Sequence, residues 1–162
     1  MPREDNEISV TLSVLDRLVD HEPDVKREPI LTRSQSLRQM KESVKRDIEI
    51  LLNTRQGDGA FSSDFKEVTR SLLSYGLPDF TSVDLSNPRD QNRLRRALES
   101  AIRTFEPRLE GVSITLEPMH NHERTIRFQI DARLQVEPAP ELVTFDTVLQ
   151  LHSGEYRVKE EG

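Results

Sequence analysis

Glu106 and Arg108 stand two residues apart in the middle of the chain, with Pro107 between them. An arginine can bind a carboxylate through two parallel hydrogen bonds, which fixes geometry as well as charge. Such a contact favours the ionised carboxylate, whereas a general acid has to be protonated. The spacing therefore predicts a structural pair that holds this part of the chain against its own fold or against a neighbouring chain.

Two histidines form the other spacing that suggests chemistry. His120 and His122 would share one face of an extended strand, but a zinc site needs at least a third ligand and none is evident. The chain has no cysteine, which excludes disulfides, thiol nucleophiles and thiolate metal sites. It has no glycine-rich phosphate loop and no recognisable setting for serine or histidine catalysis. We expect no metal, no cofactor and no catalytic residue.

The element that has to position Glu106 is an amphipathic helix within residues 86–108. Asn87 is suited to cap its N-terminus, and Pro88 suits the first helical position, where no amide donor is needed. Pro107 ends the helix because a proline cannot donate the next backbone hydrogen bond. The apolar residues recur at steps of three and four and share one buried face: Leu94, Leu98, Ala101, Ile102 and Phe105.

Charge is distributed unevenly along the chain, whose formal net charge is -6. This balance argues against general nucleic-acid binding, which needs a basic surface. The helix that ends at Pro107 is nevertheless rich in arginine, at positions 89, 93, 95, 96 and 103. These arginines either pair with acids of the same chain or form a basic strip for an acidic partner.

Helices are also expected in the first half of the chain. Residues 34–53 form the longest, capped by Ser34 or Ser36, and residues 11–20 form a short one. The short helix has to dock on its own domain or on a neighbouring subunit, because isolated helices of this length are marginal in water. A third helix is expected within residues 61–80, with Ser62 or Ser63 as its cap, Gly76 near its end and these apolar members: Phe65, Val68, Leu72 and Leu73.

The last third alternates between apolar and polar residues in three segments, around residues 112–116, 126–136 and 143–151, and residues 153–162 add a short fourth. Period-two alternation predicts an antiparallel sheet with one buried face. The fold class is therefore α+β, with two or three helices packed on one face of a three- or four-stranded sheet. A small sheet leaves edges, and an open edge can accept a strand from another chain.

Length and composition bound the organisation. A chain of 162 residues, 34% hydrophobic and 32% charged, is the size of one domain with an extra arm. We expect an N-terminal arm at residues 1–30, carrying the short docking helix, and an α+β domain at residues 31–162. No stretch approaches the roughly 20 apolar residues that span a bilayer, and the acidic start MPREDNEISV lacks the apolar core of a signal peptide. We therefore expect a cytoplasmic location.

Four stretches together resemble one protein family. FEPRLEGVSI, at residues 105–114, resembles the Glu-Pro-Arg motif of the baseplate-wedge family of contractile injection machines, once labelled lysozyme-like. SVLDRL at residues 13–18, SVKRDIEILLNTR at 43–55 and SLLSYGLPDF at 71–80 are similar to its type VI secretion branch, the TssE subunits. The resemblance spans nearly the whole chain, with its motifs in order.

The resemblance implies a structural subunit of a cytoplasmic baseplate docked at the inner membrane. Its implied partners are the wedge proteins TssF and TssG, the subunit TssK, the central hub VgrG, and the sheath subunits TssB and TssC. It also implies that the sheet is extended by a sheath strand. The residues expected to serve structure or interaction are Leu15, Leu18, Arg46, Asp47, Leu52, Asn53, Glu106, Pro107 and Arg108.

Two alternatives remain open from the sequence. The older lysozyme label suggests a peptidoglycan hydrolase, which needs two carboxyl groups flanking the scissile bond. Glu106 is the natural candidate acid, but Arg108 opposes that role, no second carboxylate stands out, and the chain has no tryptophan to line a sugar cleft. The second alternative is the equivalent wedge protein of a contractile phage tail.

Overall fold

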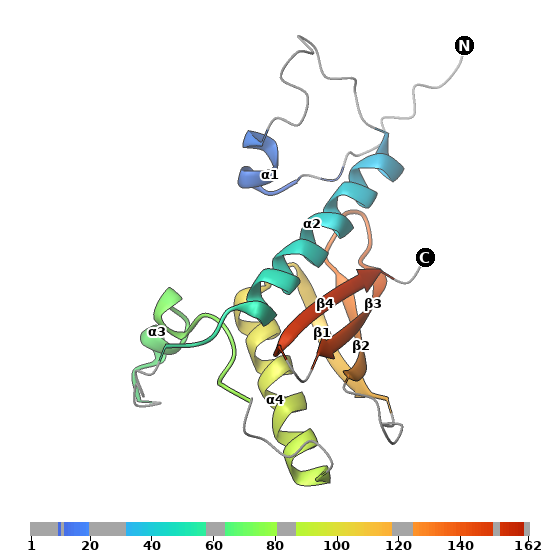
Figure 1. The fold of residues 1–162 in the computed structure, drawn as a ribbon. Helices are drawn as coiled ribbons and strands as arrows, with labels where there is room; N and C mark the ends of the chain where they lie inside the picture. Colours follow the sequence, from blue (N-terminus) through green and yellow to red (C-terminus); the bar gives the residue numbers. More distant parts are fainter. Residues whose placement is uncertain are drawn as a thin grey trace, which may run out of the picture.

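The computed structural model describes residues 10, 12–19, 32–57, 64–80, 87–117, 125–150 and 153–160. Figure 1 shows two long helices, α2 (Arg33–Asn53) and α4 (Pro88–Phe105), on one side of a four-stranded sheet. A five-residue helix, α1 (Val14–Leu18), lies beside α2. The fold is α+β with a helical N-terminal region, which confirms the predicted class.

The sheet contains β1 (Leu109–Leu116), β2 (Thr125–Leu134), β3 (Glu141–Gln150) and β4 (Glu155–Glu160). The strands are hydrogen-bonded in sequence order, and every neighbouring pair is antiparallel. Buried residues alternate with more exposed ones along β2 and β3, so one face of the sheet lies against α2 and α4. The short fourth strand is confirmed.

Side-chain caps fix where the two long helices begin. In α4 the side chain of Asn87 accepts a hydrogen bond from the Arg89 amide, and Pro88 follows it, as predicted. The cap of α2 is Thr32, which forms a capping box with Gln35, so the prediction of Ser34 or Ser36 was wrong. The sequence holds two consecutive boxes of this type, at residues 32–35 and 36–39, and the upstream one gains an additional helical turn.

The core lies between the helices and the inner face of the sheet. Its largest fully buried side chains include Phe128, Phe145, Ile48, Leu98 and Ile102. Each such side chain contributes roughly 1.5–3 kcal/mol through the removal of apolar surface from water. This packing holds the end of α4 rigidly against the start of β1.

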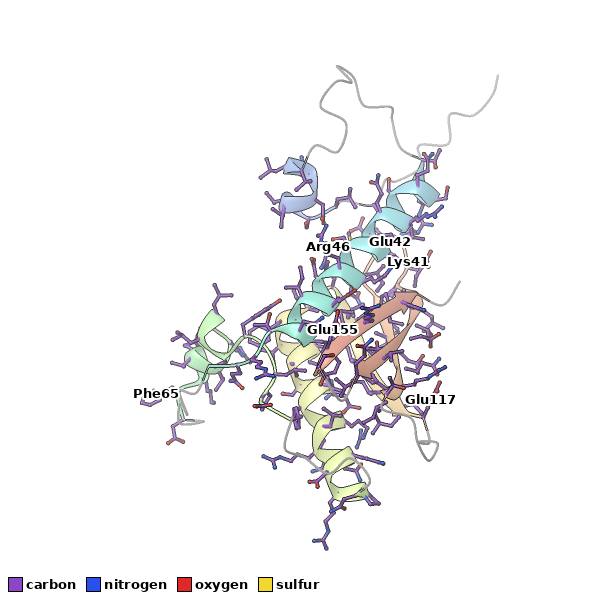
Figure 2. The ribbon with its side chains drawn as sticks, viewed as in Figure 1. Lys41, Glu42, Arg46, Phe65, Glu117 and Glu155 are labelled. Carbon is purple, nitrogen blue, oxygen red and sulfur yellow. The ribbon has the colours of Figure 1, made fainter. Side chains whose placement is uncertain are left out.

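The segment between α2 and α4 differs from the helix predicted there. Its described residues form α3 (Lys66–Thr69) and the 3-10 turn η1 (Leu72–Ser74) in place of one helix, and Phe65, Leu72 and Leu73 are largely exposed. Figure 2 shows Phe65 pointing away from the domain. The predicted caps Ser62 and Ser63 lie outside the described residues. Apolar side chains at helical spacing do not produce one continuous helix here, because Phe65, Leu72 and Leu73 are not buried against another part of the described fold.

The chain after η1 returns to the core at Gly76. Gly76 has a positive φ of 105°, and Leu77 is buried. The Leu77 amide donates to the Thr54 carbonyl at 2.8 Å, and the Gln56 amide donates to the Leu77 carbonyl at 2.8 Å. This bridge fastens the segment to the residues that follow α2.

No helix in the described part of the chain is both long enough and apolar enough to cross a lipid bilayer.

Candidate functional site

The polar site of this molecule lies where α4 meets β1. Glu106 is the C-cap residue of α4, its amide donates to the Ile102 carbonyl, and it is only 4% exposed. Arg108 donates from Nε to Glu106 Oε1 at 2.7 Å and from a terminal nitrogen to Oε2 at 2.5 Å. The side chains therefore meet in a two-point contact across Pro107, which is exposed.

Helix α2 supplies the next partners of Arg108. The guanidinium group donates to Asp47 Oδ2 at 2.5 Å and to Ser43 Oγ at 3.1 Å. Ser43 is buried, whereas the Asp47 side chain is 32% exposed. One arginine side chain thus ties the end of α4 to the middle of α2, across 61 residues of sequence.

The same network extends to the N-terminal helix. Arg46 donates to Asp16 Oδ1 at 2.7 Å and to Asp47 Oδ1 at 3.1 Å. Ser43 donates to Asp16 Oδ2 at 2.6 Å. Figure 2 shows Arg46 on the part of α2 that lies beside α1. We call these six residues the polar junction: Asp16, Ser43, Arg46, Asp47, Glu106 and Arg108.

Charge pairing stabilises the ionised forms in the polar junction. Burial alone would raise the pKa of Asp16, but hydrogen bonds from Ser13, Ser43 and Arg46, with the charge of Arg46, lower it to about 2. For Arg108, burial alone would lower the pKa, because it disfavours the charged form. The contacts with Glu106 and Asp47 outweigh burial and raise the pKa above its ordinary value. The pKa of Arg46 is raised by its hydrogen bond to Asp16 and by its contacts with Asp47. Asp16, Arg46 and Arg108 therefore stay charged near neutral pH, held by ion pairs within the junction.

The low pKa of Asp16 predicts that α1 detaches in acid. Because the pKa of Asp16 is lower in the folded protein than its ordinary value of 3.8, its contacts act in full above that pH and are lost as the pH falls toward 2. We expect the NMR amide signals of α1 to move to unfolded positions over this range. Asp16→Asn should release α1 already at pH 7, and an α1 that stays docked in this variant would refute the assignment.

The surroundings of Glu106 and Tyr75 disfavour a role for either residue in hydrolysis. Both carboxylate oxygens of Glu106 accept hydrogen bonds from Arg108, and Glu106 is only 4% exposed, which disfavours access of a glycosidic bond to this carboxylate. Tyr75 packs edge-on against Phe105, at 5.1 Å between ring centroids. Burial, with the negative charges of Asp47 and Glu106, raises the pKa of Tyr75 above its ordinary value, which disfavours a phenolate nucleophile. The arrangement is suited to holding elements together.

The structure also shows which predicted residues fall outside the polar junction. Leu52 is buried in the core, at 2% exposure. Leu15 and Leu18 lie on α1 but are 63% and 75% exposed. His120 and His122 lie outside the described residues, and within the described ranges no three His, Asp or Glu side chains are grouped as metal ligands.

Asn53 occupies the outer edge of β4. Its side chain accepts a hydrogen bond from the Tyr156 amide at 2.8 Å and donates to the Tyr156 carbonyl at 2.9 Å. These two contacts replace those that a neighbouring strand would make.

The outer edge of β1 is occupied in the same way by α4. Arg103 donates to the Val112 carbonyl at 2.9 Å, and Glu99 accepts from the Ile114 amide at 3.2 Å. Glu99 also accepts from Arg95 at 2.9 Å. The sheet therefore has less free edge than its strand order alone suggests.

Removing the Asn53 side chain should open the edge of β4. We expect Asn53→Ala to cost about 1–2 kcal/mol of unfolding free energy, because the polar backbone groups of Tyr156 lose their partners. Hydrogen exchange at the Tyr156 amide should accelerate. Asn92→Ala is the matched control, since Asn92 donates only to the exposed carbonyl of Pro88. Equal effects of the two variants would show that Asn53 does not protect the edge.

Sequence reasoning missed two members of the polar junction, Asp16 and Ser43. A local signal was present, because Ser13 and Asp16 form a reciprocal cap at the start of α1. That signal predicts a helix start, but it gives no indication that the same carboxylate also reaches Ser43 on α2.

Comparisons with known proteins find similarity over the region that contains most of the polar junction. The family model described as baseplate wedge protein gp25 matches residues 38–139. The anti-adapter protein IraD of Salmonella paratyphi A is 28% identical over 99 residues, which cover 61% of this chain and 72% of that protein. IraD of Salmonella choleraesuis is 27% identical over the same shares of both chains. The family match includes α4, β1 and every residue of the polar junction except Asp16.

Proposed function

Because this chain belongs to the baseplate wedge protein gp25 family, we propose that it is a structural subunit of a type VI secretion baseplate, linking wedge proteins to the contractile sheath. Membership of the family supports a structural role within a baseplate assembly. The polar junction suits such a role, because its partly buried ion pairs fix the geometry between elements. In this proposal Glu106, Pro107 and Arg108 are structural residues.

The observation that carries the proposal is the two-sided character of α1. On one side Asp16 is held by Ser43 and Arg46 of α2. On the other side Val14, Leu15 and Leu18 are 71%, 63% and 75% exposed. A helix this short with exposed apolar residues needs a partner to cover them. We assign this surface to the wedge proteins TssF and TssG, with residues 1–30 as the arm and residues 31–162 as the domain.

The sheet is assigned to the sheath. A strand of TssB or TssC would add to the free part of an edge, where backbone hydrogen bonds give affinity without a deep pocket. On β4 the residue in phase with Tyr156 is Val158, whose polar backbone groups face the same outer edge. TssK and the hub VgrG complete the proposed surroundings, in a cytoplasmic baseplate at the inner membrane.

A pull-down tests this assignment. We expect Leu15→Asp with Leu18→Asp to lose TssF and TssG from the host's lysate while retaining TssB and TssC. The matched control is Leu72→Asp with Leu142→Asp, because these leucines are also exposed, at 85% and 83%, but lie on other elements. The control should retain all four proteins, and both variants should keep the wild-type melting temperature.

Other co-purifying proteins would indicate a different function. If the wild-type chain recovers phage-tail proteins, it is the wedge protein of a phage particle. If it recovers an adapter protein and no baseplate subunit, the similarity to anti-adapter proteins describes its function better. If it recovers none of these from cells that express the secretion machine, the structural role is wrong and a cell-wall digestion assay becomes the next test.

A further inference from the structure

The outer face of α4 carries a row of exposed arginines. Arg89, Arg93 and Arg96 follow one another at steps of four and three residues, and exposed Ser100 continues the same face. Across the described part of the chain, none of these three guanidinium groups forms an ion pair or hydrogen bond. Arg95 and Arg103 behave differently, because they bind Glu99 and the Val112 carbonyl. We call Arg89, Arg93 and Arg96 the arginine row.

The arginine row is unfavourable for the isolated protein. Like charges three and four residues apart on a helix repel one another. Arg89 also lies in the first helical turn, where the helix dipole disfavours a cation. The two acids of α4, Asp90 and Glu99, lie three residues from Arg93 and Arg96, yet neither forms an ion pair with the row, and Glu99 is engaged by Arg95 and Ile114. Among the described residues, no direct ion pair therefore compensates the repulsion within the row.

We propose that the arginine row is a docking site for a carboxylate-rich surface of a partner protein. The row spans about 10 Å along the helix, given a rise of roughly 1.5 Å per residue. Each guanidinium group can bind one carboxylate through two hydrogen bonds. The row thus fits a surface that presents three Asp or Glu side chains over two helical turns.

Charge favours protein over nucleic acid as the occupant. The molecule carries a net charge of -6, so a polyphosphate would be repelled by most of its surface. A small acidic patch on a partner protein, by contrast, would contact the arginine row without facing the rest of the negatively charged surface. The N-terminal end of α4, which carries Arg89, reaches past the sheet in Figure 1. Neither the wedge nor the sheath assignment above uses this face, so the inference is independent of them.

Site-specific photo-crosslinking tests the proposal in cells that make the full chain. A photoreactive amino acid replaces Ser100, within the face of the arginine row, and a second strain carries it at Leu15 as a reference. We expect the Ser100 position to crosslink to a peptide with at least three Asp or Glu residues within two helical turns. Arg89→Glu, Arg93→Glu and Arg96→Glu together should lower the crosslinking yield at least about tenfold. The attraction between the row and the partner's carboxylates then becomes a repulsion between like charges.

A matched variant separates the arginine row from total charge. Lys66→Glu, Arg70→Glu and Arg127→Glu reverse three exposed cations elsewhere and change the net charge by the same amount. This control should keep the wild-type yield at Ser100, and both variants should keep the wild-type melting temperature, which reports an intact fold.

Four results would overturn the inference. They are equal yields in the two variants, a crosslinked peptide without clustered acids, nuclease-sensitive crosslinks, and no crosslink at Ser100 where Leu15 crosslinks. An acidic peptide from a protein outside the baseplate would support the docking site while counting against the proposed function, so the two ideas fail separately.

Discussion

Replacing Arg108 by methionine is expected to lower the free energy of unfolding by about 3–5 kcal/mol, measured by chemical denaturation at pH 7. Arg108 is the shared partner of Glu106, Asp47 and Ser43. Without it the Glu106 carboxylate, at 4% exposure, stays buried beside no cation. The cost of an uncompensated buried charge dominates the lost packing, because methionine keeps most of the apolar stem.

Two further variants identify the cause. Arg133→Met removes an arginine that is 57% exposed and lies 3.7 Å from Glu110, and we expect it to cost about 0–1 kcal/mol. Glu106→Leu combined with Arg108→Met should cost less than the two single substitutions added together, because no buried charge is left alone. If Arg108→Met costs no more than Arg133→Met, the polar junction does not hold α4 against α2. Glu106→Ala should also destabilise the protein or weaken partner binding.

Gly76→Ala is expected to give the second large effect. A Cβ at this position would lie 2.4 Å from the Thr54 carbonyl oxygen, and the backbone φ of 105° is strained for any residue with a side chain. Backbone strain of this kind costs about 1–3 kcal/mol, and the displaced Thr54 carbonyl adds the loss of its hydrogen bond from the Leu77 amide. Thermal unfolding should show the lower stability, and hydrogen exchange at Leu77 should accelerate.

Gly57→Ala is the control for that substitution. A Cβ at Gly57 would meet no atom within 4 Å, so the change should be neutral or slightly stabilising through the unfolded chain. If both alanine variants melt alike, the bridge between the Thr54 and Leu77 segments contributes no stability.

The sequence by itself determined the elements whose signals are local. The start of α4 follows from Asn87 and Pro88, because a cap and a fixed φ act within one helical turn. The alternation along β2 and β3 follows from the two-residue repeat of a strand with one buried face. The contact of Glu106 with Arg108 also belongs here, because both residues lie on one short turn.

Only the tertiary structure decided which distant groups meet. Asp16 reaches Arg46 across 30 residues, and Asn53 reaches Tyr156 across 103. Periodicity predicts which face of an element is buried, but it does not say which side chain on another element will lie opposite. The exposure of Leu72 and Leu73 has the same origin, since a helical pattern forms a stable helix only where the fold supplies a surface to cover it.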